Sequence, residues 1–325
     1  MTNATTSNPT RYDVAIVGGG PAGLTAGLWL ARYLHSVVLI DSGDPRNWQT
    51  RGINGYLGHP GIRPAELRGD GREECRRHGV VLIDELVDRT DTTGDGGFEL
   101  YTASGQRFEA SRLLLAIGIK DIWPTIPGLD ACFGASIHVC PDCDGFDARG
   151  NKILVIGRGR RAVGMALSLT TWTDDIVVCT NGHDPEIEAD LLAKLDALDI
   201  PVLDAHIERV HATGGLVNAV EFGNGLQLDC DRIFFSIAQY PADDLGVQLG
   251  CERDEHGQII VDYAFHTTVM NVFAAGDITP GPQLAIRAAA DGAIAAMSIH
   301  KSLVPEERKL DGSASTPGVM AKARP

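Results

Sequence analysis

Two cysteines, Cys140 and Cys143, form the closely spaced pair among the seven cysteines of this chain. Two intervening residues suit a disulfide that opens and closes reversibly at the start of a helix. The helix N-terminus there favours a thiolate, which is the reactive form of the side chain. Asp144 follows Cys143 directly, so it lies within one residue of the reacting sulfurs, where a positioned acid eases thiolate expulsion. We therefore expect Cys140, Cys143 and Asp144 to form a redox centre.

Other interpretations of the same stretch stay open at this point. Cys132 and His138 lie just before the pair, and the four side chains together would be a possible zinc ligand set. All four fall within one short stretch without a second paired motif, so we predict no metal site. A purely structural disulfide is uncommon in a reducing compartment. Asp142, inside the motif, rivals Asp144 as the acid, although we expect it to be an exposed charge at a helix start.

A glycine-rich loop near the N-terminus points to a dinucleotide. Gly18, Gly20 and Gly23 follow the β-branched run 12–17 and precede an apolar helical stretch. In this context the first glycine permits a tight turn, the second lets the backbone approach a pyrophosphate, and the third lets helix and strand pack closely. Pro21 and Ala22 complete the loop, at a helix N-terminus that favours phosphate. Asp41 ends the next strand, where a carboxylate can accept from ribose hydroxyls.

A second loop of the same spacing, from Gly157 to Ala162, follows a second strand. The residues after its next strand, Cys179 to Gly182, include neither an acid for the NADH ribose nor an arginine pair for the NADPH phosphate. We therefore expect no pyridine nucleotide here. The loop is then a structural relic of a duplication, or else Arg158, Arg160 and Arg161 bind some other anion.

Composition sets the broad class. The chain has 325 residues, 44% apolar and 22% charged, with 38 Gly and 16 Pro, which excludes global disorder and a coiled coil. Its formal net charge of −15 argues against nucleic acid or an anionic membrane as partner. The N-terminus has no secretory pattern and no apolar run is long enough for a bilayer. We expect a cytoplasmic protein whose five isolated cysteines are small core residues.

The elements between these motifs predict an α/β fold with two Rossmann-like nucleotide-binding domains, the second inserted in the first. The strand, glycine loop and helix at Gly18 recur at Gly157, which indicates an internal duplication. We predict a nucleotide-binding domain over 11–117 and 246–310, an inserted domain over 118–245 that carries the cysteine pair, and flexible tails at 1–10 and 311–325. We predict strands at 12–17, 36–42, 112–119, 152–156, 176–178 and 271–275 and helices at 24–34, 65–78, 163–169, 187–198 and 283–301.

Taken together, the motifs resemble the low-molecular-weight thioredoxin reductase family of FAD-dependent flavoproteins, over about residues 11–302. The resemblance rests on these residues: GGGPAG at 18–23 with Asp41, Asn54-Gly55, Ala116-Ile-Gly118, CPDCDG at 140–145, the second glycine loop, and FAAGD at 273–277.

The resemblance implies roles for individual residues. FAD would occupy the first glycine loop, with Ala116, Gly118 and Gly276 beside it. Asp277 would bind the ribityl chain, and the helix beginning near Leu284 and Ala285 would point at the flavin. Asn54 would lie near the isoalloxazine. Cys143 would face the flavin, Cys140 would attack the protein disulfide, and Asp144 would be the acid. The family also implies a homodimer.

Three departures from the family pattern argue against NADPH as electron donor. Thr180-Asn-Gly182 replaces the phosphate-binding stretch, Gly164 and Met165 stand where an acid is usual, and Gln283-Leu284 replaces an Arg-Gln pair. The chain therefore resembles the pyridine-nucleotide-independent branches of the family, which include ferredoxin-linked and deeply rooted thioredoxin reductases and dithiol oxidases.

Our main functional hypothesis is a thioredoxin reductase that passes electrons from FAD through Cys143 and Cys140 to thioredoxin or a similar dithiol protein. We expect a donor other than NADPH, and a ferredoxin-type protein is one candidate. The first alternative is a dithiol oxidase that closes a disulfide in a small molecule, with oxygen as acceptor. The second alternative is a flavin redox sensor without turnover. A broad surface around Cys140 favours a protein substrate, whereas a closed apolar pocket favours a small one.

Overall fold

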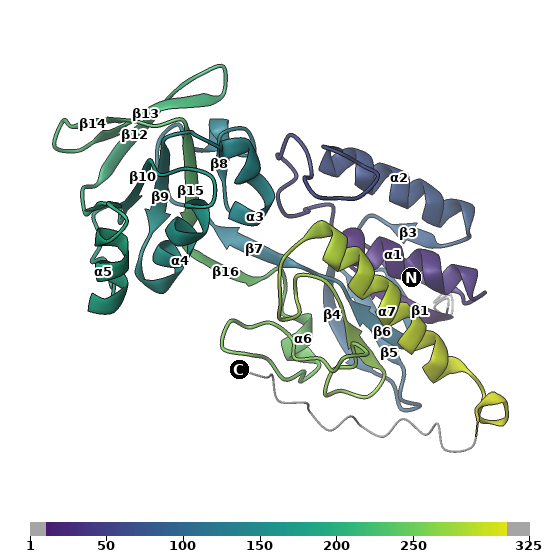
Figure 1. Cartoon of the computed structure of the whole chain (residues 1–325). Coiled ribbons are helices and arrows are strands. Elements are labelled where there is room, and N and C mark those ends of the chain that lie inside the picture. Colours follow the sequence, from purple (N-terminus) through teal and green to yellow (C-terminus); the bar gives the residue numbers. More distant parts are fainter. Residues whose placement is uncertain (1–10, 311–325) are drawn as a thin grey trace, which may run out of the picture. The chain divides into compact units, whose positions relative to one another are not determined.

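A computed structural model of the chain describes residues 11–310. The two tails predicted at 1–10 and 311–325 lie outside the described residues. The described chain divides into two units (Figure 1). The first contains the residues up to Arg46, Ala65–Lys120 and those from Tyr240 on, and the second contains Asn47–Pro64 and Asp121–Gln239.

The first unit is built on a seven-stranded sheet in the order β3-β2-β1-β6-β5-β4, with β17 also paired to β6. Five strands run parallel to one another: β3, β2, β1, β6 and β17. The sheet continues beyond β6 with β5 and β4, which pair antiparallel. All four residues of β2 are buried, as expected for a parallel strand covered on both faces. The strands are β1 (Arg11–Val17), β2 (Val37–Ile40), β3 (Val81–Ile83), β4 (Val87–Thr92), β5 (Phe98–Thr102), β6 (Arg107–Leu115) and β17 (Val272–Ala274).

Two helices of this unit, α1 (Pro21–Arg32) and α7 (Ala285–Leu303), pack side by side (Figure 1). Their crossing is close because a Cβ added to Gly292 would stand 2.1 Å from the carbonyl oxygen of Ala22. Alanine side chains of both helices join the strands in one core cluster. The unit's other helices are α2 (Pro64–Arg77), α6 (Leu245–Gln248) and the 3-10 turn η3 (Glu306–Arg308).

The second unit repeats the plan with a parallel sheet in the order β11-β10-β9-β15-β8. A separate antiparallel sheet, β12-β13-β14, follows. The elements are β8 (Ile137–His138), β9 (Ile153–Gly157), β10 (Ile176–Cys179), β11 (Val202–Leu203), β12 (Ile207–Thr213), β13 (Leu216–Phe222), β14 (Gln227–Asp229), β15 (Arg232–Ser236), α3 (Pro141–Asp144), α4 (Gly159–Leu169), α5 (Ala189–Asp196), η1 (Asp130–Cys132) and η2 (Phe146–Ala148).

The strand orders of the two parallel sheets correspond one to one, which confirms the predicted pair of Rossmann-like domains with the second inserted in the first. The chain passes from the first unit to the second through β7 (Ile119–Ile122) and returns through β16 (Ala238–Pro241), and these two strands pair with each other. The segment Asn47–Pro64 groups with the second unit although it lies within the first domain in sequence. No helix among residues 11–310 is long and apolar enough to cross a membrane.

Candidate functional site: a dinucleotide cradle and a redox disulfide

The first glycine loop has the geometry of a dinucleotide cradle. Gly18 has φ +105°, and a Cβ there would lie 2.2 Å from the carbonyl oxygen of Ala116, so only glycine fits. Gly20 is the N-cap of α1, so no side chain caps the first amides of the helix. The first turn, which begins with Pro21 and Ala22, contains no acidic residue. The amides of this turn and the helix dipole are therefore arranged for an anion.

Asp41 lies beside this loop in a pocket of arginines that sequence reasoning missed. Its side chain is buried, and its Oδ2 contacts the guanidinium of Arg68 and, at 3.6 Å, Nη1 of Arg72. Nε of Arg68 and Nη1 of Arg72 are buried without a hydrogen-bond partner in the described chain. The two arginines are four residues apart on α2, one turn apart on one helix face, and that spacing was the available signal.

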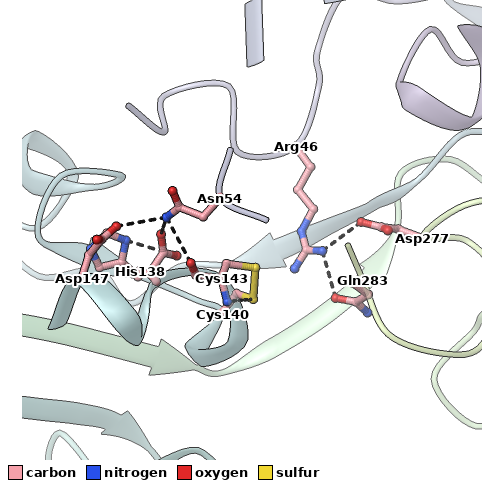
Figure 2. The surroundings of a disulfide bond; sticks show 9 residues. Arg46, Asn54, His138, Cys140, Cys143, Asp147, Asp277 and Gln283 are labelled. Atoms are coloured by element: carbon pink, nitrogen blue, oxygen red, sulfur yellow. Dashed lines mark hydrogen bonds and ion pairs between the residues drawn. A yellow bond between two sulfur atoms is a disulfide. The ribbon is translucent and has the colours of Figure 1, made fainter. Parts of the chain in front are cut away.

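Asp277 lies at the other end of the cradle, after β17. Its Oδ2 accepts a hydrogen bond from Nη1 of Arg46 at 3.0 Å, and the same Nη1 donates to Oε1 of Gln283 at 2.9 Å (Figure 2). Leu284 caps α7 without a side-chain hydrogen bond, and the first turn, from Ala285, contains no acid. Arg46 was not predicted from sequence, because nothing in the local pattern marks it.

These features of the first unit fit FAD. The N-terminus of α1 can face the pyrophosphate and that of α7 can face the flavin, and neither first turn contains an acidic residue. The unsatisfied guanidinium atoms beside Asp41 can face the ribose end. Gly18, Gly20 and Gly23 would hold the phosphates, and Asp41 and Asp277 the hydroxyls. Ala116 and Gly118 border the loop: Ala116 N–H donates to Val17 at 2.8 Å, and Gly118 O accepts from Ala242 at 3.1 Å.

Cys140 and Cys143 form a disulfide, with their Cα atoms 5.3 Å apart. Cys140 is the N-cap of α3, and its Sγ accepts a hydrogen bond from the Cys143 N–H at 3.1 Å. Gly145 ends this short helix against Trp172, where an added Cβ would stand 2.4 Å from the indole ring. The packing of Gly145 on Trp172 therefore holds the cysteine loop in place.

Three polar side chains outside α3 lie near the cysteine pair: those of Asn54, His138 and Asp147 (Figure 2). Nδ2 of Asn54 lies 3.1 Å from the Cys143 carbonyl oxygen, 3.2 Å from Oδ2 of Asp147 and 3.4 Å from Oδ1 of Asp144. Nδ1 of His138 faces Oδ2 of Asp144 at 3.4 Å. The predicted residues Asn54, Cys143 and Asp144 are thus brought together within the second unit. Asp142 is exposed, in agreement with its interpretation as a helix-start charge.

The five other cysteines are all free and buried, which confirms that they are core residues. Burial raises the pKa of Cys75 and of Cys179 to about 11 and that of Cys230 to about 12, so these thiols are poor nucleophiles at neutral pH. Cys132 belongs to the core of the second unit. Among residues 11–310, no group of three or more His, Cys, Asp and Glu side chains could hold a metal ion.

The second glycine loop is hydrogen-bonded to a nearby segment of the same unit, residues 184–188. We call residues 184–188 the acidic strap, since it carries Asp184, Glu186 and Glu188. Gly159 N–H, the first amide of α4, donates to the Pro185 carbonyl at 2.8 Å. Arg158 Nη1 pairs with Glu186 Oε1 at 2.9 Å, and Arg160 Nη1 pairs with Glu188 Oε2 at 2.8 Å. α4 begins at Gly159, four residues before the helix predicted at Val163, because the loop's own residues form its first turn.

Comparisons with known proteins agree with this geometry. A family described as pyridine nucleotide-disulphide oxidoreductase matches residues 12–292. A probable thioredoxin reductase of Arthroderma benhamiae is 32% identical over 184 residues, 55% of this chain and 46% of that protein's length. The thioredoxin reductase tcpT of Claviceps purpurea is 31% identical over 276 residues, 82% of this chain and 86% of that protein.

A solved structure agrees in three dimensions. The crystal structure of a putative thioredoxin reductase, TrxB, from Bacillus anthracis superposes with a TM-score of 0.85 at 30% identity, covering 91% of this chain and all of that one. The chain therefore belongs to the pyridine nucleotide-disulphide oxidoreductases and, within them, to the low-molecular-weight thioredoxin reductase family, as an FAD-dependent disulfide oxidoreductase.

Proposed function

We propose that this enzyme reduces a disulfide of thioredoxin or a similar dithiol protein, through Cys140 and Cys143, with an electron donor other than NADPH. The observation that carries the proposal is the position of the Cys140–Cys143 disulfide at the start of α3. The Cys143 N–H points at Sγ of Cys140 at 3.1 Å. In the reduced pair this donor stabilises a negative charge on Cys140, which makes Cys140 the attacking thiolate.

The exchange then follows from the positions of the side chains. Cys140 attacks one sulfur of the substrate disulfide, and the other sulfur leaves with a proton from Asp144. Cys143 next attacks Cys140, restores the disulfide and releases the second substrate thiol. Asn54 contacts both the Cys143 carbonyl and Asp144 and orients the acid. FAD, when bound, supplies the electron pair that reopens the disulfide.

The surface around the pair supports a protein as substrate. α3 contains no buried residue. The ring of Phe146, just beyond it, is 60% exposed, and the Arg149 guanidinium lies 3.8 Å from the ring centroid. An exposed aromatic ring with an arginine beside a reactive group is typical of the centre of a protein interface.

The acidic strap supports a donor other than NADPH. A dinucleotide at a glycine loop needs the first amides of the helix for its pyrophosphate, and here the amide of Gly159 is bonded to Pro185. Glu186 and Glu188 also compensate the charges of Arg158 and Arg160. All four side chains are more than half exposed, so each pair adds little to stability. Their effect is to remove the positive potential that would attract phosphate.

The turn that follows β10 also supports a donor other than NADPH. Oγ1 of Thr180 donates to the His183 carbonyl at 2.6 Å, and Oδ1 of Asn181 accepts from the Ile207 N–H at 2.8 Å. Side-chain oxygens of the residues at the place of the family's phosphate-binding stretch are therefore already hydrogen-bonded to backbone groups of the second unit. A ferredoxin-type donor is sufficient: a two-electron transfer from roughly −400 mV to thioredoxin at roughly −270 mV releases about 6 kcal/mol.

Anaerobic titration of the purified protein tests the donor proposal. NADPH, NADH and reduced ferredoxin are added separately while the flavin absorbance is recorded. We expect ferredoxin to bleach the flavin and both pyridine nucleotides to act slowly. Rapid bleaching by micromolar NADPH would refute the proposal. Oxygen uptake with a small dithiol, in place of thioredoxin reduction, would identify a dithiol oxidase.

A further inference from the structure

One ring nitrogen of a buried histidine beside the redox pair forms no hydrogen bond within residues 11–310. His138 lies on β8, and its relative exposure is 8%. Its Nδ1 has no hydrogen-bond partner in the described chain. Leaving a buried nitrogen without a hydrogen bond destabilises the folded state, so a folded protein that retains one needs an explanation for it.

The surroundings of His138 indicate that explanation. Nδ1 faces Oδ2 of Asp144 at 3.4 Å. On the other side, β15 presents the ring of Phe234, with ring centroids 5.4 Å apart. The other charged group at this end of α3 is Asp147, which reaches Asn54 at 3.2 Å. Asp144 is therefore the charged group that faces the imidazole, and its side chain is 17% exposed.

Asp144 stands between two different partners. Its Oδ1 lies 3.4 Å from the amide Nδ2 of Asn54, which is a hydrogen-bond donor at every pH. Its Oδ2 faces an imidazole, whose ring nitrogens can donate or accept a proton. Asn54 can hold the carboxyl in place, and of these two partners His138 is the one that can exchange a proton with it.

We propose that His138 is a positioning residue of the disulfide exchange, sharing with Asp144 the proton that Asp144 passes to the departing substrate thiolate. This inference rests on the proposed function. In the exchange, Cys140 forms a bond to one substrate sulfur and the substrate S–S bond breaks. The departing thiolate takes a proton from Asp144, and His138 passes its own proton to Asp144.

The second half of the exchange completes the balance. Cys143 attacks Sγ of Cys140, the bond between Cys140 and the substrate breaks, and the Cys140–Cys143 disulfide forms. The second substrate sulfur leaves with the proton of the Cys143 thiol. The enzyme dithiol is oxidised by two electrons and the substrate disulfide is reduced by two. One of the two protons comes from the pair formed by His138 and Asp144.

The leaving group gives a direct test, because an acidic thiol departs without a proton and an ordinary thiol does not. The holoenzyme is reduced, freed of reductant and mixed without oxygen with hydroxyethyl disulfide or with dithiobis(nitrobenzoate). We expect His138→Phe to slow exchange with hydroxyethyl disulfide about tenfold and exchange with dithiobis(nitrobenzoate) less than about twofold. Equal slowing of both reactions would show that His138 only supports the fold, and wild-type rates with both would overturn the proposal.

Further variants make the test independent of folding. His138→Asn keeps a polar group near Nδ1 that cannot pass on a proton, so we expect exchange with hydroxyethyl disulfide to remain slow. A wild-type rate for His138→Asn with this disulfide would contradict the proposal. The double variant with Asp144→Asn should be no slower than Asp144→Asn alone. Additive losses would mean that His138 does not act through Asp144.

A second histidine–carboxylate pair in the same unit gives the matched control. Nε2 of His211 lies 2.8 Å from Oε2 of Glu221, on the hairpin of β12 and β13. His211→Phe should leave both exchange rates unchanged. A wild-type protein that reacts with neither disulfide would contradict the proposed function itself. A reactive wild type with an unaffected His138→Phe contradicts only the role of His138.

Discussion

At the scale of single residues, the two sulfurs are not equivalent. Sγ of Cys140 accepts the N–H of Cys143, so the thiolate of the reduced pair belongs on Cys140. We therefore expect Cys140→Ser and Cys143→Ser each to lower thioredoxin reduction by about a thousandfold or more. Cys143→Ser should also abolish electron exchange with the flavin. Cys140→Ser should show a long-wavelength charge-transfer band, because it leaves a thiolate at Cys143. Wild-type turnover in either variant would disprove the dithiol mechanism.

The proton donor, Asp144, is also a matter of single residues. Asp144 contacts Asn54 and faces His138, whereas Asp142 is exposed in the same helix turn. We expect Asp144→Asn to slow disulfide turnover at least about tenfold with unchanged FAD content, and Asp142→Asn to have much less effect. The two variants change the same charge on the same helix, so each is the control for the other. Equal and mild effects would show that both carboxylates only stabilise the start of α3.

At the scale of elements, we expect the acidic strap to lower the affinity of the second glycine loop for NADPH. Replacing both Glu186 and Glu188 by Gln leaves the positive charges of Arg158 and Arg160 uncompensated. We expect the double variant to bind NADPH about tenfold more tightly at low salt, measured by calorimetry, and to lose this gain as salt rises. Replacing Glu252 and Glu255, which are exposed and in the other unit, makes the same charge change and should have no effect. Unaltered affinity in the strap variant would assign the weak binding to the Thr180–Gly182 turn.

The start of α6 makes stability depend on pH. Burial raises the pKa of Asp243 to about 6, and the hydrogen bond from the Leu245 N–H at 2.9 Å opposes this only in part. A pKa raised in the folded state adds stability at low pH, and this contribution is lost as pH rises from about 4 to about 6. Asp243→Asn should therefore raise the free energy of unfolding at pH 7 by about 1–2 kcal/mol and flatten its slope over that interval, measured by urea unfolding. Asp70→Asn, at an exposed helix position, is the control. An unchanged slope would show that Asp243 titrates normally.

The sequence predicted the elements that carry periodic or glycine signals. β1, β2, α1 and α7 lie within a few residues of their predicted bounds. α5 is shorter than predicted, Ala189–Asp196 in place of 187–198, because the preceding residues form the strap. The sheet β12-β13-β14 was not predicted. Its strands alternate weakly between buried and exposed residues, and their pairing depends on contacts that no local pattern records.

The site was predictable where chemistry is local in the chain, as in the cysteine pair and the first glycine loop. Arg46, Arg68 and Arg72 were missed, because an arginine beside a distant carboxylate looks like any surface arginine in sequence. His138 was noticed only as a possible zinc ligand. Its relation to Asp144 depends on the way α3 folds back beside β8, which spacing alone does not give.

At the scale of the whole molecule, duplication explains how the two functions are divided. The parallel strands have the same order in both units, but the two glycine loops have different surroundings. The first unit has an open glycine loop with arginines beside Asp41, and the second has a loop closed by its own strap and the disulfide at the start of α3. We infer that the first copy serves FAD and that the second serves the substrate.

The most direct test of this division is a single anaerobic turnover. Holoenzyme with photochemically reduced flavin is mixed with oxidised thioredoxin, and flavin absorbance and thioredoxin thiols are recorded together. We predict that flavin reoxidises as equal amounts of thioredoxin dithiol appear, and that both signals vanish in Cys140→Ser. A flavin that stays reduced beside oxidised thioredoxin, or that reoxidises equally well in Cys140→Ser, would contradict electron transfer through Cys140 and Cys143.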